Sequence, residues 1–126
     1  MDRYFYIAIG AAVGGMLRYA LGSVTAQRFG PQFPMGTLVV NLTGCFLIGL
    51  AMSLLDRFGA NPRWGFLLVT GLLGGYTTFS SFGWETYVFV RHGLPLRALA
   101  YPLISVVGGV LAVWLGAFMA GLNRPA

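Results

Sequence analysis

The sequence predicts an all-α integral membrane protein with four transmembrane helices. Of its 126 residues, 57% are hydrophobic and only 9% are charged, whereas an ordinary soluble domain has about 25% charged residues. So few charges cannot cover a water-exposed surface. A membrane-spanning helix needs about 20 mostly apolar residues, and four such helices with short loops use nearly the whole chain. We therefore expect residues 1–126 to form a single four-helix transmembrane domain.

Polar or turn-rich segments divide the chain into these four spans. The breaks are residues 22–34, 56–63 and 91–97, and the predicted spans are residues 4–21, 35–55, 64–90 and 96–121. The first span carries Arg18 and no convincing cleavage site, so we expect a retained helix rather than a signal peptide. The third span is longer than a bilayer requires, and its middle is rich in glycine and hydroxyl side chains. We expect this helix to break near its middle.

The charges favour a membrane surface over a nucleic-acid partner, because all eight basic residues are arginines spread singly along the chain. With four spans both termini lie on one side of the bilayer. Arg3, Arg57, Arg63 and Arg124 then face one compartment, and Arg18, Arg28, Arg91 and Arg97 face the other. Since the basic bias of short loops sets orientation, this equal division predicts insertion both ways, and equal amounts of the two orientations would allow an antiparallel two-fold dimer. The alternative is a single orientation fixed by one strong positional effect.

Polar side chains at membrane depth are candidates for function, because they are costly unless they are satisfied. Asn41 lies inside the second span, with Thr37 one turn before it and Cys45 one turn after it on the same helix face. An asparagine amide offers two donors without a charge, which suits a transiently bound anion. The alternative for Asn41 is an interhelical hydrogen bond that only holds the bundle together.

A denser set of donors is the run from Tyr76 to Phe82, which contains hydroxyl groups flanking Phe79 and ending at Phe82. The hydroxyls include Ser80 and Ser81, and the two phenylalanines are spaced to share one helix face. Ring edges carry positive charge and hydroxyls donate, so this segment can solvate an anion weakly enough to release it. The alternative is that the rings are plain core and the serines bond their own helix backbone.

Three further features bear on the same region. The glycines before the hydroxyls favour an unwound turn; they are Gly71, Gly74 and Gly75. An unwound turn frees backbone carbonyls, and those of Gly74 and Thr77 are candidate ligands for a cation. In an antiparallel dimer this cation would lie near the two-fold axis. Arg18 is placed to draw anions toward a vestibule near one membrane face. Glu85 continues the face of Phe82 and marks a candidate end of the pore; the alternative for both charges is interfacial anchoring or intersubunit pairing.

These residues resemble the signature blocks of the CrcB/Fluc fluoride channels over essentially the full chain. The matching segments are Gly15-Met-Leu-Arg18-Tyr, Gly36-Thr-Leu-Val-Val-Asn41-Leu-Thr-Gly44 and Thr70-Gly-Leu-Leu-Gly-Gly-Tyr-Thr-Thr-Phe-Ser-Ser-Phe82. The resemblance implies a dual-topology homodimer in the inner (plasma) membrane with two antiparallel pores, which exports fluoride passively and lowers its toxicity. It also implies a structural sodium ion (Na+) at the dimer centre.

Carried onto this chain, the resemblance gives each candidate a role. Asn41 donates to the anion, Phe79 and Phe82 supply ring edges, Ser80 and Ser81 supply a polar track, Arg18 is the vestibule arginine, and the carbonyls of Gly74 and Thr77 hold sodium. Two departures are visible: the family's Phe-Ser-Thr-Phe is Phe-Ser-Ser-Phe here, and Gly83 stands where a serine is often found. The first keeps a hydroxyl donor, and the second removes one.

Other functions fit less well. An enzyme is disfavoured because the chain has one histidine, one cysteine and no pair of carboxylates suited to acid and base roles. A small multidrug-type exporter coupled to protons needs a membrane-embedded carboxylate in its first span, where this chain has Arg18. A membrane subunit that transports nothing is the remaining alternative, and it leaves Asn41 and the hydroxyl run unexplained.

Overall fold

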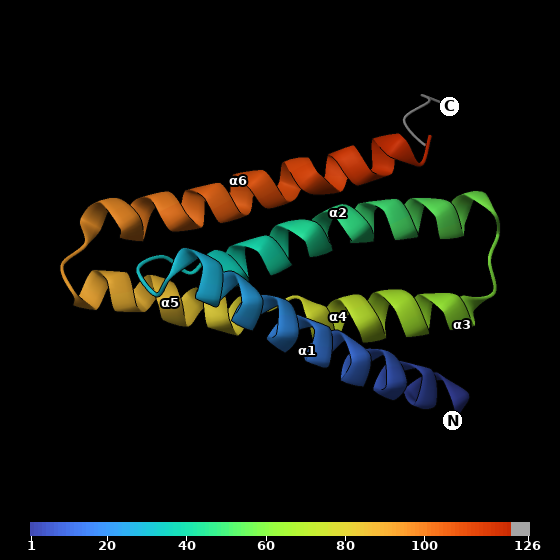
Figure 1. Ribbon diagram of the computed structural model, residues 1–126. Coiled ribbons are helices and arrows are strands. Elements are labelled where there is room, and N and C mark those ends of the chain that lie inside the picture. The colour runs from blue at the N-terminus through green and yellow to red at the C-terminus, as the bar shows by residue number, and fades with distance from the viewer. Residues whose placement is uncertain (122–126) are drawn as a thin grey trace.

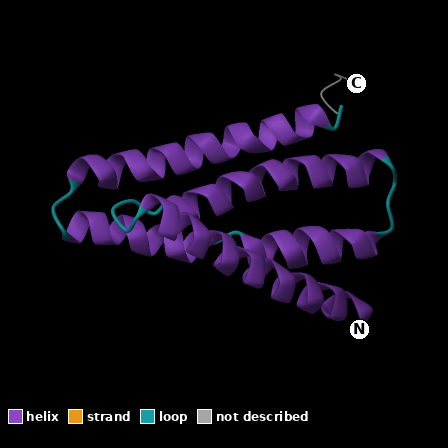
Figure 2. Cartoon of the chain, viewed as in Figure 1, coloured by secondary structure: helices purple, strands orange, loops and turns teal. Residues whose placement is uncertain are grey.

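The computed structural model describes residues 1–121, which form helices joined by short loops and include no strand (Figure 2). The helices are α1 (Asp2–Phe29), α2 (Met35–Arg57), α3 (Pro62–Trp64), the π-helix η1 (Gly65–Leu73), α4 (Gly74–Tyr76), α5 (Phe79–Arg91) and α6 (Pro95–Met119). Three of them, α1, α2 and α6, are long and apolar enough to cross a membrane. The fourth crossing is shared by α3, η1, α4 and α5, which follow one another along one line interrupted before α5 (Figure 1).

The predicted class, a four-helix membrane fold with a broken third helix, is therefore confirmed. The start of α1, the loop from α2 to α3 and the end of α6 lie at one end of the bundle, and the other two loops lie at the opposite end (Figure 1). This arrangement agrees with the predicted sidedness of the arginines, except that Arg124 lies outside the described residues. The antiparallel homodimer stays a prediction.

The first predicted break is wrong in its extent. Residues 22–34 were expected to leave the helix, but α1 continues to Phe29 and ends at Gly30, whose φ is 76°. The hydroxyl of Thr25 donates to the Leu21 carbonyl at 2.6 Å, so this buried polar residue is satisfied inside the helix. The polar composition of residues 22–34 predicts a loop. Residues 22–29 instead extend the helix beyond its apolar part, and the loop to α2 is residues 30–34.

Glycines allow the backbone of α1 to pack directly against the backbones of η1 and α4. A β-carbon at Gly10 would overlap the Leu67 carbonyl oxygen, and one at Gly75 would lie 2.5 Å from the Ala11 carbonyl oxygen. Gly14 and Gly71 make similar approaches to the facing helix. Gly10 and Gly14 are spaced GxxxG, and so are Gly71 and Gly75. Both pairs therefore serve packing within the chain, as small residues commonly do between membrane helices.

The helix breaks at Thr77 and Thr78, not at the glycines before them. Both residues have extended backbone, with φ and ψ of −82° and 157° for Thr77 and −148° and 113° for Thr78. The glycines stay helical: Gly74 has a φ of −63°. The expected break is thus present, but it falls on the hydroxyl residues, where side chains can satisfy the released backbone groups.

Candidate functional site

The helix break is held by Asn41 of α2, whose side chain pairs with the backbone N–H and C=O of one residue of the extended segment, Thr78. Its Nδ2 donates to the Thr78 carbonyl at 3.0 Å, and the Thr78 N–H donates to its Oδ1 at 2.8 Å. An amide side chain has one donor group and one acceptor, so it replaces both backbone hydrogen bonds that Thr78 would make inside a helix. One N–H of the amide remains free of this pairing. The interhelical role left open for Asn41 is therefore present, and it leaves a donor for a second partner.

Thr78 then starts α5 as its N-cap residue. Its hydroxyl oxygen accepts from the Ser81 N–H at 3.3 Å and lies 3.1 Å from Ser81 Oγ and 3.4 Å from Ser80 Oγ. Capping by a threonine side chain satisfies one of the unpaired N–H groups at the start of a helix. The hydroxyls of Thr78, Ser80 and Ser81 therefore form a connected group at the N-terminus of α5, where the helix dipole favours negative charge.

A cavity of about 340 Å³, here called the break cavity, lies beside this segment. It is lined by residues of α2, α5 and α6, by the end of η1 with α4, and by the break itself; Asn41, Cys45, Phe79, Phe82 and Ser105 are among them. The hydroxyl oxygen of Ser105 is buried and has no hydrogen-bond partner within the described part of the chain. A buried hydroxyl without a partner is costly, so the break cavity presents an unused polar group as well as ring edges.

The two phenylalanines have different surroundings. Their ring centroids lie 5.5 Å apart with planes at 46°, so the predicted shared face is present. Phe82 also packs against Tyr101 of α6, with centroids 5.4 Å apart. Phe79 is 83% exposed in the single chain. One ring is therefore fixed in the bundle, and the other projects from it.

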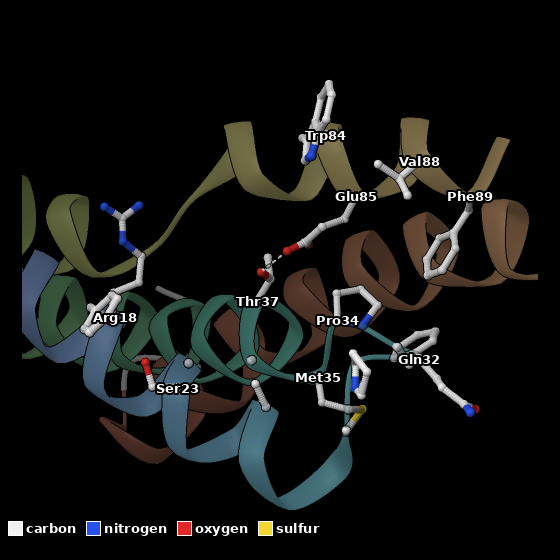
Figure 3. Close-up of a pocket in the computed structure, with 17 residues that line it drawn as sticks. Arg18, Ser23, Gln32, Pro34, Met35, Thr37, Trp84, Glu85, Val88 and Phe89 are labelled. Atoms are coloured by element: carbon white, nitrogen blue, oxygen red, sulfur yellow. Dashed lines mark hydrogen bonds between the residues drawn. The ribbon is translucent and has the colours of Figure 1, made fainter. Parts of the chain in front are cut away.

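Ser80 and Ser81 line a second cavity, the hydroxyl cavity, of about 460 Å³, together with Thr37, Thr78 and Arg18. A neighbouring cavity of about 560 Å³, here called the vestibule, shares Arg18 and Thr37 with it and is also lined by Glu85 (Figure 3). The predicted pore residues are thus divided between two cavities. Asn41, Phe79 and Phe82 line the break cavity, Thr37, Ser80 and Ser81 line the hydroxyl cavity, and Thr78 borders both.

Glu85 connects the vestibule with the core. Its Oε1 accepts from the Thr37 hydroxyl at 2.6 Å (Figure 3), and its Oε2 accepts from the Tyr101 hydroxyl at 2.7 Å. Tyr101 is fully buried and touches Phe82. Both carboxylate oxygens therefore have donors, and no ion pair with Arg18 occurs among residues 1–121. Glu85 acts as a hydrogen-bonded group of the bundle rather than a free surface anchor.

Sequence reasoning missed Tyr101 and Ser105. They are the polar side chains of the last span between Arg97 and Trp114, and they are spaced by four residues, one helix turn. The rule that singled out Asn41, that polar groups at membrane depth are costly, applies to both and was a usable signal. Ser105 lines the break cavity, and Tyr101 links Phe82 to Glu85.

The carbonyls of Gly74 and Thr77 have lost the donors that a continuous helix would give them. The partner four residues after Gly74 is Thr78, whose N–H is taken by Asn41, and the partner four residues after Thr77 is Ser81, whose N–H is taken by the Thr78 hydroxyl. Carbonyl oxygens released in this way are ligands of the kind that hard cations prefer. The arrangement therefore fits the predicted cation ligands.

Comparison with known proteins decides the family. The family described as CrcB-like protein, Camphor Resistance (CrcB), matches residues 5–117 of the chain. The chain belongs to the CrcB family. With its long apolar helices, this CrcB-like chain is a multi-pass membrane protein.

Several relatives of this CrcB-like chain carry the name fluoride-specific ion channel FluC. The protein of Solibacter usitatus is 53% identical over 119 residues, which cover 94% of this chain and 98% of the relative. That of Chloroflexus aurantiacus is 46% identical over 125 residues, covering 98% and 97%. That of Aquifex aeolicus is 45% identical over 117 residues, covering 92% and 94%. The similarity extends over nearly the full length of both proteins in each pair.

Proposed function

We propose that this protein is a passive, fluoride-selective ion channel that exports fluoride across the plasma membrane and lowers its toxicity in the cytoplasm. The observation that carries this proposal is the set of uncharged donors around the helix break, formed by Asn41, the hydroxyls that start α5, and the two phenylalanine rings. The names of its full-length relatives support the choice of fluoride.

The chemistry of the break suits a small anion in transit. Fluoride gives up a strong hydration shell on entering, so a path across the membrane must offer donors in its place. Around the break these donors are neutral, and the full positive charge on the cavity walls belongs to Arg18, which lines both the hydroxyl cavity and the vestibule. Sites of this kind bind weakly enough to release the ion. Arg18 attracts anions at the entrance without holding them inside.

The bonds to Glu85 constrain the roles of Thr37 and Tyr101. A hydroxyl has one proton, and in both residues this proton points at the Glu85 carboxylate. Thr37 can therefore donate to an anion only when its bond to Glu85 opens. These bonds support a role for Glu85 at the end of the donor path, where it controls whether the Thr37 and Tyr101 hydroxyls are available.

We further propose that the channel is an antiparallel homodimer. Phe79 is 83% exposed beside the break, although its ring is a pore candidate. Neither the backbone conformation nor the packing within residues 1–121 requires glycine at position 74. The φ of Gly74 is ordinary for a helix, and a β-carbon there would meet only the Val69 carbonyl oxygen, at 3.8 Å. A glycine inside a helix costs about 1 kcal/mol relative to alanine. A partner subunit packed against Gly74 and Phe79 accounts for both features.

Within this dimer, the carbonyls of Gly74 and Thr77 from both subunits are proposed to bind a structural sodium ion. The ion would offset the repulsion between the partial negative charges of carbonyl oxygens gathered at the interface, and it would so hold the two subunits together. Sodium should then raise the thermal stability of the purified dimer more than the bulky cation N-methyl-D-glucamine at equal ionic strength. Equal stability in the two salts would contradict the sodium site and leave the channel proposal standing.

The test of the channel is fluoride release from liposomes that contain the purified protein, followed with a fluoride electrode. A channel should empty its liposomes within seconds, without a pH gradient and without releasing chloride at a comparable rate. Release no faster than from protein-free liposomes would end the proposal. A proton-coupled exporter would need the gradient, and α1 offers such coupling no membrane-embedded acid, since its one carboxylate, Asp2, lies at its first residue, near Arg63.

A further inference from the structure

The last residue before the helix break, Tyr76, is tied to α2 by its hydroxyl. Tyr76 is 8% exposed, and its hydroxyl oxygen lies 2.7 Å from Thr43 Oγ1. Thr43 Oγ1 also lies 2.7 Å from the Val39 carbonyl oxygen, which can only accept. Because the threonine hydroxyl has one proton and gives it to Val39, Tyr76 is the donor in the bond to Thr43. The sequence run that contains Tyr76 suggested an anion donor, but this hydroxyl proton is already used.

The bond is one of three successive contacts between α2 and the break. Thr43 accepts from Tyr76, the bare backbone of Gly44 receives the γ-methyl group of Thr77, and Asn41 pairs with Thr78. A β-carbon at Gly44 would overlap that methyl group. The three contacts hold residues 76–78 against α2.

The helical turn before the break packs against α1 through the backbone of Gly75, which lies close to Ala11, and its contact with α2 is made by the side chain of Tyr76. The turn α4 is only three residues long, and two of them, Gly74 and Gly75, are glycines, which have the widest conformational freedom. Its one side chain is that of Tyr76. Rotation of this turn moves the Gly74 carbonyl directly, and it moves the Thr77 carbonyl through the adjoining peptide.

We propose that the Tyr76 hydroxyl and Thr43 are positioning residues for the cation, because they fix the turn that carries the Gly74 carbonyl and leads directly into Thr77. This inference rests on the proposed sodium site. Tyr76 itself contacts neither the cation nor the anion. Loss of the bond lets the carbonyls spread over more orientations, so sodium binds more weakly while the fluoride-contacting groups are unchanged.

The experiment measures thermal unfolding of the purified full-length protein against sodium concentration, with N-methyl-D-glucamine keeping the ionic strength constant. A bound ion raises stability once its concentration exceeds the dissociation constant, so the onset of stabilisation reports sodium affinity. A hydrogen bond of ordinary strength predicts that Tyr76→Phe and Thr43→Val raise this onset concentration about 3- to 10-fold. Fluoride release at high sodium should return to near the wild-type rate.

The controls separate positioning from plain stability. Thr43→Ser keeps the acceptor and should keep the wild-type onset, whereas Thr25→Val removes a similar threonine bond to the helix backbone, away from the break, and should not shift it. If Tyr76→Phe does not fold, the comparison of Thr43→Val with Thr43→Ser carries the test. If the variants unfold at lower temperature at every sodium concentration but stabilisation begins at the wild-type sodium concentration, the positioning role is overturned. A wild-type protein without sodium-specific stabilisation would overturn the sodium site itself.

Discussion

Replacing Asn41 by aspartate keeps the shape of the side chain and changes one group. The Asn41 amide donates to the Thr78 carbonyl at 3.0 Å. An aspartate carboxylate turns this bond into a contact between two oxygens, and leaving the carbonyl unpaired costs about 1–3 kcal/mol. The new charge also repels an anion about 4 Å away by about 4 kcal/mol at an effective dielectric constant of about 20. The repulsion alone corresponds to about a thousandfold loss of fluoride flux.

The assay is fluoride release from liposomes, with size-exclusion chromatography to check assembly. Asn61→Asp is the matched control. Asn61 Oδ1 accepts from the Arg63 N–H at 3.0 Å at an exposed helix start, and a carboxylate accepts there equally well. This control should release fluoride at the wild-type rate. Asn41→Asp protein that assembles normally and conducts as the wild type does would refute the reasoning that places Asn41 on the anion path.

Three further predictions concern the rings, the orientation and the packing. Phe79→Ile and Phe82→Ile keep apolar bulk but remove the ring edge, so fluoride release should fall sharply while size-exclusion shows intact dimers; wild-type release in both variants would leave the rings as plain core. A topology reporter fused to the C-terminus should be found on both sides of the membrane at native expression, and one side only would contradict dual topology. Gly14→Ala puts a β-carbon onto the Leu72 carbonyl and should destabilise the protein by about 1–3 kcal/mol in thermal unfolding. The neighbouring Gly15→Ala meets open space and should be neutral or slightly stabilising; equal effects of the two changes would contradict the close helix contact.

The four spans could be predicted from the sequence because their signal is compositional. Apolar stretches of sufficient length are set by the thickness of the bilayer, which acts on each helix separately. The position of the break could not be read in the same way. The glycines favour an unwound turn at Gly71, Gly74 and Gly75, but the structure breaks at Thr77 and Thr78 because Asn41, on a different helix, pairs with the backbone of Thr78. Such a contact joins residues 37 positions apart, and no local pattern reports it.

The candidate site was predictable in its residue types and not in its grouping. Asn41 and the phenylalanines were found because polar and aromatic groups stand out in an apolar span. Their division from Ser80 and Ser81 into two cavities depends on how α5 leaves the break. Tyr101 was overlooked, yet it joins Phe82 to Glu85 from a fourth helix.

The length of α1 has a consequence for the membrane around the protein. Its 28 residues extend about 42 Å at 1.5 Å per residue, against about 30 Å of hydrocarbon and about 40–45 Å between the headgroup regions. Arg3 and Arg28, near its two ends, are therefore far enough apart along the helix to reach the phosphate layers of opposite leaflets. A helix anchored at both ends cannot slide along the bilayer normal, so a thinner bilayer must tilt it or deform around it. Since Gly10 and Gly14 join α1 to the segment that leads into the break, lipid thickness is mechanically coupled to the centre of the molecule.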